Sequence, residues 1–132
     1  DSDLRAEGSY LAAIEEYVEA KFFYNYLAGK EIDYLKLDFP IGYDEYLSGI
    51  CDFTGELTRK AVILAGKGDY KKVIEIRQLV ENLIAEIIKF DLVGKLRVKY
   101  DDAKRNLKRL EEIVYDLQIR GHKYTGAAKK PD

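Results

Sequence analysis

The chain has 132 residues, enough for one domain with one hydrophobic core, and its 47% apolar and 35% charged residues exclude disorder and suit a soluble helical protein. One cysteine and one histidine exclude an internal disulfide framework and a cysteine/histidine zinc site, and the cytosol is the expected compartment. No run of 18 apolar residues occurs, so no membrane-spanning helix or membrane partner is predicted.

The net charge of -2 hides an uneven distribution of charge along the chain. Residues 1–94 carry 11 basic and 18 acidic side chains, whereas residues 95–132 carry 11 basic and 6 acidic side chains. A folded protein can therefore present an acidic site and a basic surface together, although its overall charge suggests neither.

Helix-forming residues dominate, and breakers divide the chain into four predicted helices, at residues 3–28, 44–65, 70–90 and 95–120. Gly29 and Gly121 are expected to end the first and the fourth helix, because glycine is common just past a helix end. Asp69 is the predicted N-cap of the third helix. A weak strand pattern around Leu35 to Phe39 lies in the first connector.

Short turns join the last three predicted helices, which should therefore pack as antiparallel neighbours. The sequence predicts an all-α antiparallel bundle that forms a single domain over residues 1–121, followed by a flexible tail at residues 122–132.

The first predicted helix is apolar on almost every side, since only five of the 19 residues from Tyr10 to Ala28 are polar. Such a helix is normally buried on most sides, within a domain or an oligomer. Glu16 and Glu19 share one face with large apolar neighbours. Burying carboxylates is costly, so protonation, a basic partner or a metal ion should compensate; a wet surface is the alternative.

The second predicted helix carries a stripe of charged residues that includes Asp52, Glu56 and Arg59. Two glycines, Gly49 and Gly55, lie beside this stripe, although each costs roughly 1 kcal/mol in a helix interior. Small residues allow a neighbouring helix to approach closely. If that neighbour is the first helix, its glutamates and Asp52 converge.

Convergent carboxylates without histidine form an all-oxygen site, which favours Mg²⁺ or Mn²⁺ over zinc. The matching chemistry is phosphodiester hydrolysis, with one acid orienting the attacking water. On pattern alone the stripe on the second helix is better explained as a solvated face with ion pairs within the helix.

Four segments, in order along the chain, resemble the translin/TRAX superfamily. EYVEA at residues 16–20 and CDFTGEL at 51–57 resemble TRAX segments, whereas DEYLSG at 44–49 and EEIVYDLQIRG at 111–121 are similar to translin segments. The resemblance implies α-helical subunits that assemble into closed, hollow oligomers, commonly octamers. It also implies a further helix before Asp1, which would be missing or trimmed here.

The resemblance further implies an endoribonuclease that needs Mg²⁺ or Mn²⁺. Its catalytic and metal-binding acids map onto Glu16, Glu19 and Asp52, with Glu56 as a further candidate ligand. Translin has no acid at the position of Asp52, so this chain is expected to form a homo-oligomer that both assembles and cuts RNA. The alternatives are a non-catalytic oligomer that binds single-stranded RNA or DNA, and a purely structural helical subunit.

Candidate RNA contacts are basic residues near the acids and along the fourth predicted helix. Contacts to backbone phosphates should dominate the affinity, so binding should weaken steeply with salt. A solvated basic face is an equally good explanation for any one residue of the fourth helix. The candidates are Lys21, Arg59, Lys60, Arg105, Arg109 and Arg120.

Overall fold

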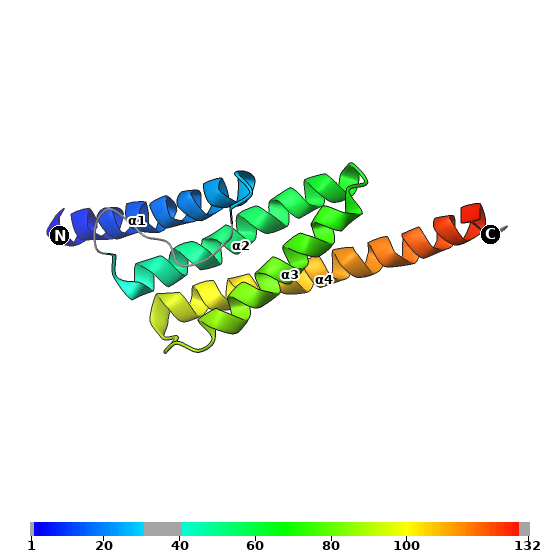
Figure 1. The fold of residues 1–132 in the computed structure, drawn as a ribbon. Coiled ribbons are helices and arrows are strands. Elements are labelled where there is room, and N and C mark those ends of the chain that lie inside the picture. Colours follow the sequence, from blue (N-terminus) through cyan, green and yellow to red (C-terminus); the bar gives the residue numbers. More distant parts are fainter. Residues whose placement is uncertain (1, 31–40, 130–132) are drawn as a thin grey trace.

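A computed structural model describes the backbone of residues 2–30 and 41–129 and the side chains of residues 6–30 and 41–120. Four helices make up the fold (Figure 1): α1 (Ser2–Leu27), α2 (Tyr43–Gly66), α3 (Tyr70–Ile87) and α4 (Gly94–Lys129). The described residues contain no strand, which confirms the all-α prediction, and the strand pattern around Leu35 to Phe39 lies outside them. Within the same residues, no helix combines the length and apolar character needed to cross a bilayer.

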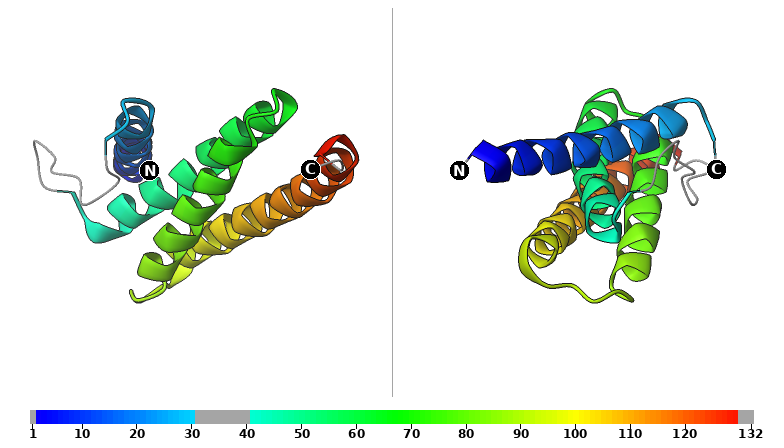
Figure 2. Two further views of the ribbon diagram at one scale, coloured as in Figure 1. Left: turned by 45° about the vertical axis from the view of Figure 1, so that its right-hand side comes forward. Right: turned by 90° about the vertical axis from the view of Figure 1, so that its left-hand side faces the viewer.

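Helices α2, α3 and α4 pack on one another, and successive helices run in opposite directions, as the short turns predict (Figure 1). The left view of Figure 2 shows α1 almost end-on while the other three are seen lengthwise, so α1 crosses them. Among the described helices, α1 packs closely only on α2. The second half of α4 extends past the ends of the other helices.

The helix ends follow the expected turn chemistry at two positions. Gly29 has a φ of 74°, a conformation that glycine adopts without strain, and α1 ends two residues before it. The Asp69 side chain accepts a hydrogen bond from the backbone amide of Lys72 at 3.4 Å, which confirms Asp69 as the N-cap of α3.

Two predicted ends differ from the structure. Helix α3 was predicted to end at Phe90. It ends at Ile87, and the chain forms a turn between Ile87 and Phe90. Helix α4 continues through Gly121 and Gly126 to Lys129, because each glycine in a long helix costs only roughly 1 kcal/mol and no proline follows within the helix. The flexibility expected of residues 122–132 stays a prediction.

The core lies where α2 meets the other three helices. From α1 it receives Ile14, Val18 and Phe22, which are four residues apart and so fall on one face. Phe22 packs against Phe53 of α2, with 5.6 Å between the ring centroids. The largest fully buried side chains from α2, α3 and α4 are Phe53, Leu57, Val73, Ile76, Val80, Ile87 and Leu110.

The side of α1 that faces away from α2 stays apolar and exposed in the single chain. Tyr10, Tyr24 and Leu27 each expose more than half of their surface. Helix α1 was predicted to be buried on most sides. Within the single chain, only the side that packs against α2 is buried. The remaining apolar surface is available for contact with another subunit.

The two glycines of α2 differ in what surrounds them. A Cβ atom placed on Gly49 would lie 2.6 Å from Cβ of Val18 and 3.0 Å from the backbone oxygen of Glu15, both on α1. A Cβ atom on Gly55 would meet only the Asn106 side chain, at an ordinary 3.6 Å. Gly49 therefore permits the close approach of α1 to α2 that the sequence predicted, whereas Gly55 faces α4.

Candidate active site

Carboxylates of α1 and α2 face one another across the seam that Gly49 opens. Glu19 is half-buried on α1, and its pKa responds to the charges of Asp52 and Glu56 on α2. Asp52 and Glu56 are each partly exposed, with side-chain exposures of 29% and 30%. Glu16, the other predicted acid of α1, is exposed to solvent.

The pKa of Glu19 is raised above its ordinary value of 4.5. Burial contributes most, followed by the negative charges of Asp52 and Glu56 and, more weakly, of Glu16; the positive charge of Lys99 opposes them. A negative charge at Glu19 is therefore less favourable than on a free glutamate, and a further cation would favour it. A carboxylate whose pKa is raised by burial and by neighbouring carboxylates is a candidate for a functional site.

Lys99, which lies on α4, contacts Asp52 of this cluster. The Lys99 ammonium donates to Oδ1 and Oδ2 of Asp52 at 2.9 and 2.7 Å and lies 3.3 Å from Oε1 of Glu15. Burial lowers the pKa of Lys99, but the hydrogen bonds and charges of Asp52 and Glu15 outweigh it and raise that pKa above its ordinary value. Lys99 therefore remains protonated at neutral pH.

Glu15 is the buried acid of α1, and the sequence analysis did not nominate it. It is only 5% exposed, and its Oε2 accepts a hydrogen bond from Lys95 of α4 at 3.0 Å. The available signal was its position three residues before Val18, on the face that packs against α2. Because α1 is apolar all round, periodicity alone did not reveal which face is buried.

Cys51, next to Asp52, takes no part in the proposed chemistry. Burial, together with the charge of Asp52, raises the pKa of its thiol to about 12. The thiol is therefore neutral and acts as a small packing group in the core.

The oxygen donors of this cluster suit a hard divalent cation, which would relieve the repulsion around Glu19. Among the described residues, however, no group of three or more acidic, histidine or cysteine side chains is arranged to hold an ion. Mg²⁺ commonly uses only one or two carboxylates and completes its shell with water and substrate phosphate. Two carboxylates would therefore suffice, and Glu16, Glu19, Asp52 and Glu56 all stay predictions as ligands.

The predicted RNA-binding residues differ in the side chains that they contact. Arg59 lies 3.7 Å from Glu56, and Arg105 pairs with Asp102 one turn earlier on α4. Lys21 lies over the Tyr17 ring, 5.7 Å from its centroid. Lys60 is partly buried on α2.

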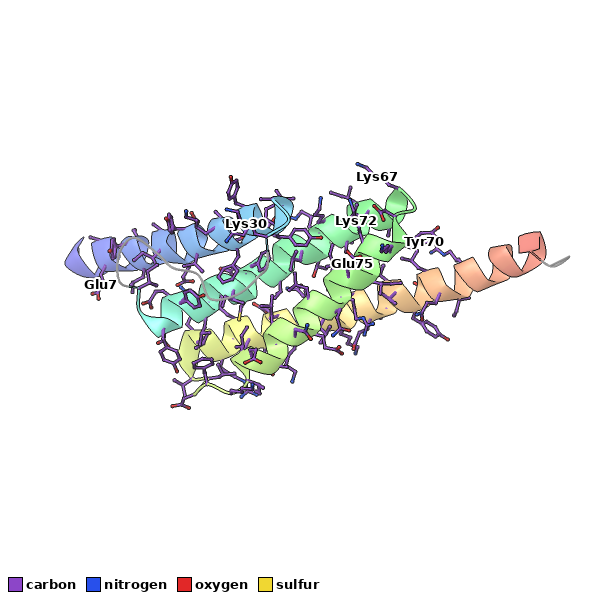
Figure 3. The ribbon with its side chains drawn as sticks, in the orientation of Figure 1. Glu7, Lys30, Lys67, Tyr70, Lys72 and Glu75 are labelled. Carbon is purple, nitrogen blue, oxygen red and sulfur yellow. The ribbon has the colours of Figure 1, made fainter. Side chains whose placement is uncertain are left out.

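Arg109 and Arg120 line a groove of about 220 Å³ between the C-terminal end of α2 and residues 109–120 of α4. Val62, Ile113 and Leu117 form its apolar part, and Asp116 contributes one acid. Neither arginine makes an ion pair within the described part of the chain. Figure 3 shows Lys67, Lys72 and Glu75 at the nearby α2–α3 turn, at the opposite end of the fold from Glu7.

Glu19→Gln should stabilise the fold at neutral pH. A carboxyl with a raised folded-state pKa stabilises the fold below its unfolded pKa, and this contribution is lost as the pH rises through the folded value. We expect the variant to melt at a higher temperature than the wild type near about pH 7, and the difference to shrink near about pH 4. Thermal unfolding monitored by circular dichroism measures both.

The exposed Glu86 on α3 provides the control, because it pairs only with Lys89. Glu86→Gln should leave the melting temperature nearly unchanged at either pH. Equal melting temperatures of the wild type and Glu19→Gln near neutral pH would show that the carboxylates of α1 and α2 do not repel one another.

Comparison with sequence families and curated proteins gives consistent matches. The model of the Translin family matches residues 5–121. Translin of Bos taurus and translin of Homo sapiens are each 34% identical over 125 residues, covering 90% of the chain and 55% of each relative. Translin-associated protein X of Rattus norvegicus is 30% identical over 79 residues, covering 58% of the chain and 27% of that protein. The chain spans about half the length of the translins it matches.

Solved structures show the same fold. The crystal structure of AfC3PO superposes with a TM-score of 0.72 at 26% identity, covering 82% of this chain and 58% of that one. The structure of AfC3PO in complex with duplex RNA superposes equally well, with the same coverage. The part of AfC3PO that matches α1 to α4 thus belongs to a protein that has been captured with RNA.

Proposed function

Because the chain belongs to the translin family, we propose that it is a subunit of a divalent-cation-dependent endoribonuclease that cleaves RNA phosphodiester bonds inside a homo-oligomer. One observation carries this proposal: Glu19 of α1 is partly buried beside Asp52 and Glu56 of α2, so that burial and then these negative charges raise its pKa. Catalytic sites commonly hold such mutually repelling groups at a cost in stability.

Each acid has a role in this proposal. Glu19 and Asp52 would hold Mg²⁺ or Mn²⁺, with Glu56 and the exposed Glu16 beside them. When bound, the ion would neutralise charge on the phosphate and lower the pKa of a bound water. One acid beside the ion would orient the attacking water and accept its proton.

The RNA backbone would be held by arginines and lysines on both sides of the acids. Arg59 lies about two turns from Asp52 along α2 and can exchange Glu56 for a phosphate, with Lys60 and Lys21 as further candidates. Arg109 and Arg120, which make no ion pair with another described residue, line the groove between α2 and α4. Arg105 would first have to leave Asp102.

Assembly into a closed, hollow octamer completes the proposal. The exposed apolar side of α1, with Tyr10, Tyr24 and Leu27, supplies surface for a neighbouring subunit. A cage would shield the acids from bulk solvent and select RNA that can enter. The cytosol stays the proposed location of this assembly.

A second candidate function is non-catalytic binding of single-stranded RNA or DNA. Two observations favour it: Lys99 already pairs with Asp52, and no group of three potential ligand residues is arranged for a metal in the described part of the chain. The relatives that cover most of the chain carry the name translin. This candidate keeps the RNA-binding arginines and removes the cleavage step.

A cleavage assay separates the two candidates. End-labelled single-stranded and duplex RNA are incubated with the protein in Mg²⁺ or in EDTA, and the products are resolved on native and denaturing gels. The nuclease predicts shortened RNA in Mg²⁺ only. Retarded but intact RNA in both buffers would support the binding candidate, and free, intact RNA at low salt would contradict both.

A further inference from the structure

Two lysines bridge a gap between helices that do not otherwise pack together. Helix α1 packs closely only on α2 among the described helices, yet Lys95 and Lys99 of α4 both contact Glu15 of α1. Lys99 also contacts Asp52 of α2, at 2.7 Å. The acid cluster therefore includes a cation supplied by the chain itself.

The two lysines are not equivalent. The Lys99 ammonium contacts carboxylates of α1 and α2, and its two shortest contacts engage both oxygens of Asp52. Lys95 contacts Glu15, and its side chain is 65% exposed, whereas that of Lys99 is 24% exposed. Lys99 thus occupies the carboxylate that a divalent ion would need, and Lys95 does not.

A lysine ammonium is a compact, strongly hydrated charge on a flexible stem, so it can leave one oxygen ligand for another. A divalent ion on Asp52 would lie within a few ångströms of the ammonium, where like charges repel strongly. The two cations would therefore compete for the carboxylate oxygens of Asp52. A phosphate group beside Asp52 would give the displaced ammonium a new anionic partner.

We propose that Lys99 is a built-in counter-ion that competes with divalent cations for Asp52 and moves to the RNA phosphate when metal and substrate bind together. This inference rests on the proposed nuclease function. It makes metal binding weak without RNA and stronger with it, because each ligand favours the displaced position of Lys99. The subunit would then hold its metal ion mainly when RNA is present.

The test measures Mn²⁺ binding to the full chain without RNA, by calorimetry and by loss of the spin-resonance signal of free Mn²⁺. Lys99→Gln removes the competing charge and leaves Glu15 paired with Lys95. Lys95→Gln is the matched control, since it leaves Glu15 paired with Lys99. We expect Lys99→Gln to bind Mn²⁺ at least about tenfold more tightly than the wild type, and Lys95→Gln to change affinity by less than about threefold.

A second measurement adds a non-cleavable RNA to the same titrations. The RNA should tighten Mn²⁺ binding to the wild type by about tenfold and to Lys99→Gln by much less, since that variant has no ammonium to move. Thermal melts of both lysine variants verify that they are folded.

The outcomes separate this inference from the proposed function. Equal Mn²⁺ affinity in the wild type and Lys99→Gln would overturn the competition and leave the nuclease proposal intact. If Lys95→Gln and Lys99→Gln both bound Mn²⁺ more tightly than the wild type by the same factor, the inference would also be overturned. The gain in affinity would then come from the change in net charge alone. Absence of Mn²⁺ binding in every protein would overturn both proposals together.

Discussion

Replacement of Asp52 by asparagine is expected to reduce metal-dependent RNA cleavage by at least about 100-fold, the scale seen when one electrostatic group of an active site is removed. Asparagine keeps the shape of the side chain but loses the charge that would hold the ion. The fold should survive, because Lys99 keeps Glu15 as a partner. Initial rates of cleavage of labelled RNA in Mg²⁺ measure the effect.

Two controls accompany this variant. Glu86→Gln changes an exposed acid on α3 that pairs with Lys89, and it should cleave RNA at the wild-type rate. Light scattering should give Asp52→Asn the same particle mass as the wild type. Cleavage by Asp52→Asn at the wild-type rate would remove the proposed mechanism, whatever RNA the protein binds.

Substitution of Gly49 by alanine is expected to destabilise the protein by about 1–3 kcal/mol, the usual cost of overpacking. The added methyl group would lie 2.6 Å from the Val18 side chain, which is fully buried and has no room to retreat. Helix α1 would have to move away from α2. Chemical denaturation gives the change in the free energy of unfolding.

Gly55→Ala is the matched control on the same helix. Its methyl group would find ordinary contact distances, so the gain in helix propensity should stabilise the protein by up to about 1 kcal/mol. The two variants should therefore differ in the sign of their effect. If both glycines tolerate alanine equally, the seam between α1 and α2 is looser than the contact at Gly49 indicates.

The sequence predicted most of the fold because its signals are local. Gly29 and Asp69 act on the backbone within a few residues, and the structure confirms the turn and the cap that they predict. The predicted end of α4 at Gly121 was wrong, because a single glycine is a weak signal for the end of a helix. Whether Gly121 ends the helix depends on the summed preference of its neighbours.

The candidate site was predicted less completely, because it depends on contacts between helices far apart in sequence. Gly49 correctly indicated that α1 approaches α2. Nothing in the local pattern showed that α4 would bring Lys99 to Asp52, which precedes it by 47 residues. The burial of Glu15 rather than Glu16 was also hidden, since the faces of α1 differ little in polarity.

The single seam between α1 and α2 has a consequence for how the protein opens. Because α1 packs on no other described helix, it can detach while α2, α3 and α4 keep their shared core. Detachment would carry Glu15 and Glu19 away from Asp52 and dismantle the acid cluster. The acid cluster would thus persist only as long as α1 stays packed on α2. A neighbouring subunit in contact with α1 would prolong the lifetime of the cluster without touching any acid.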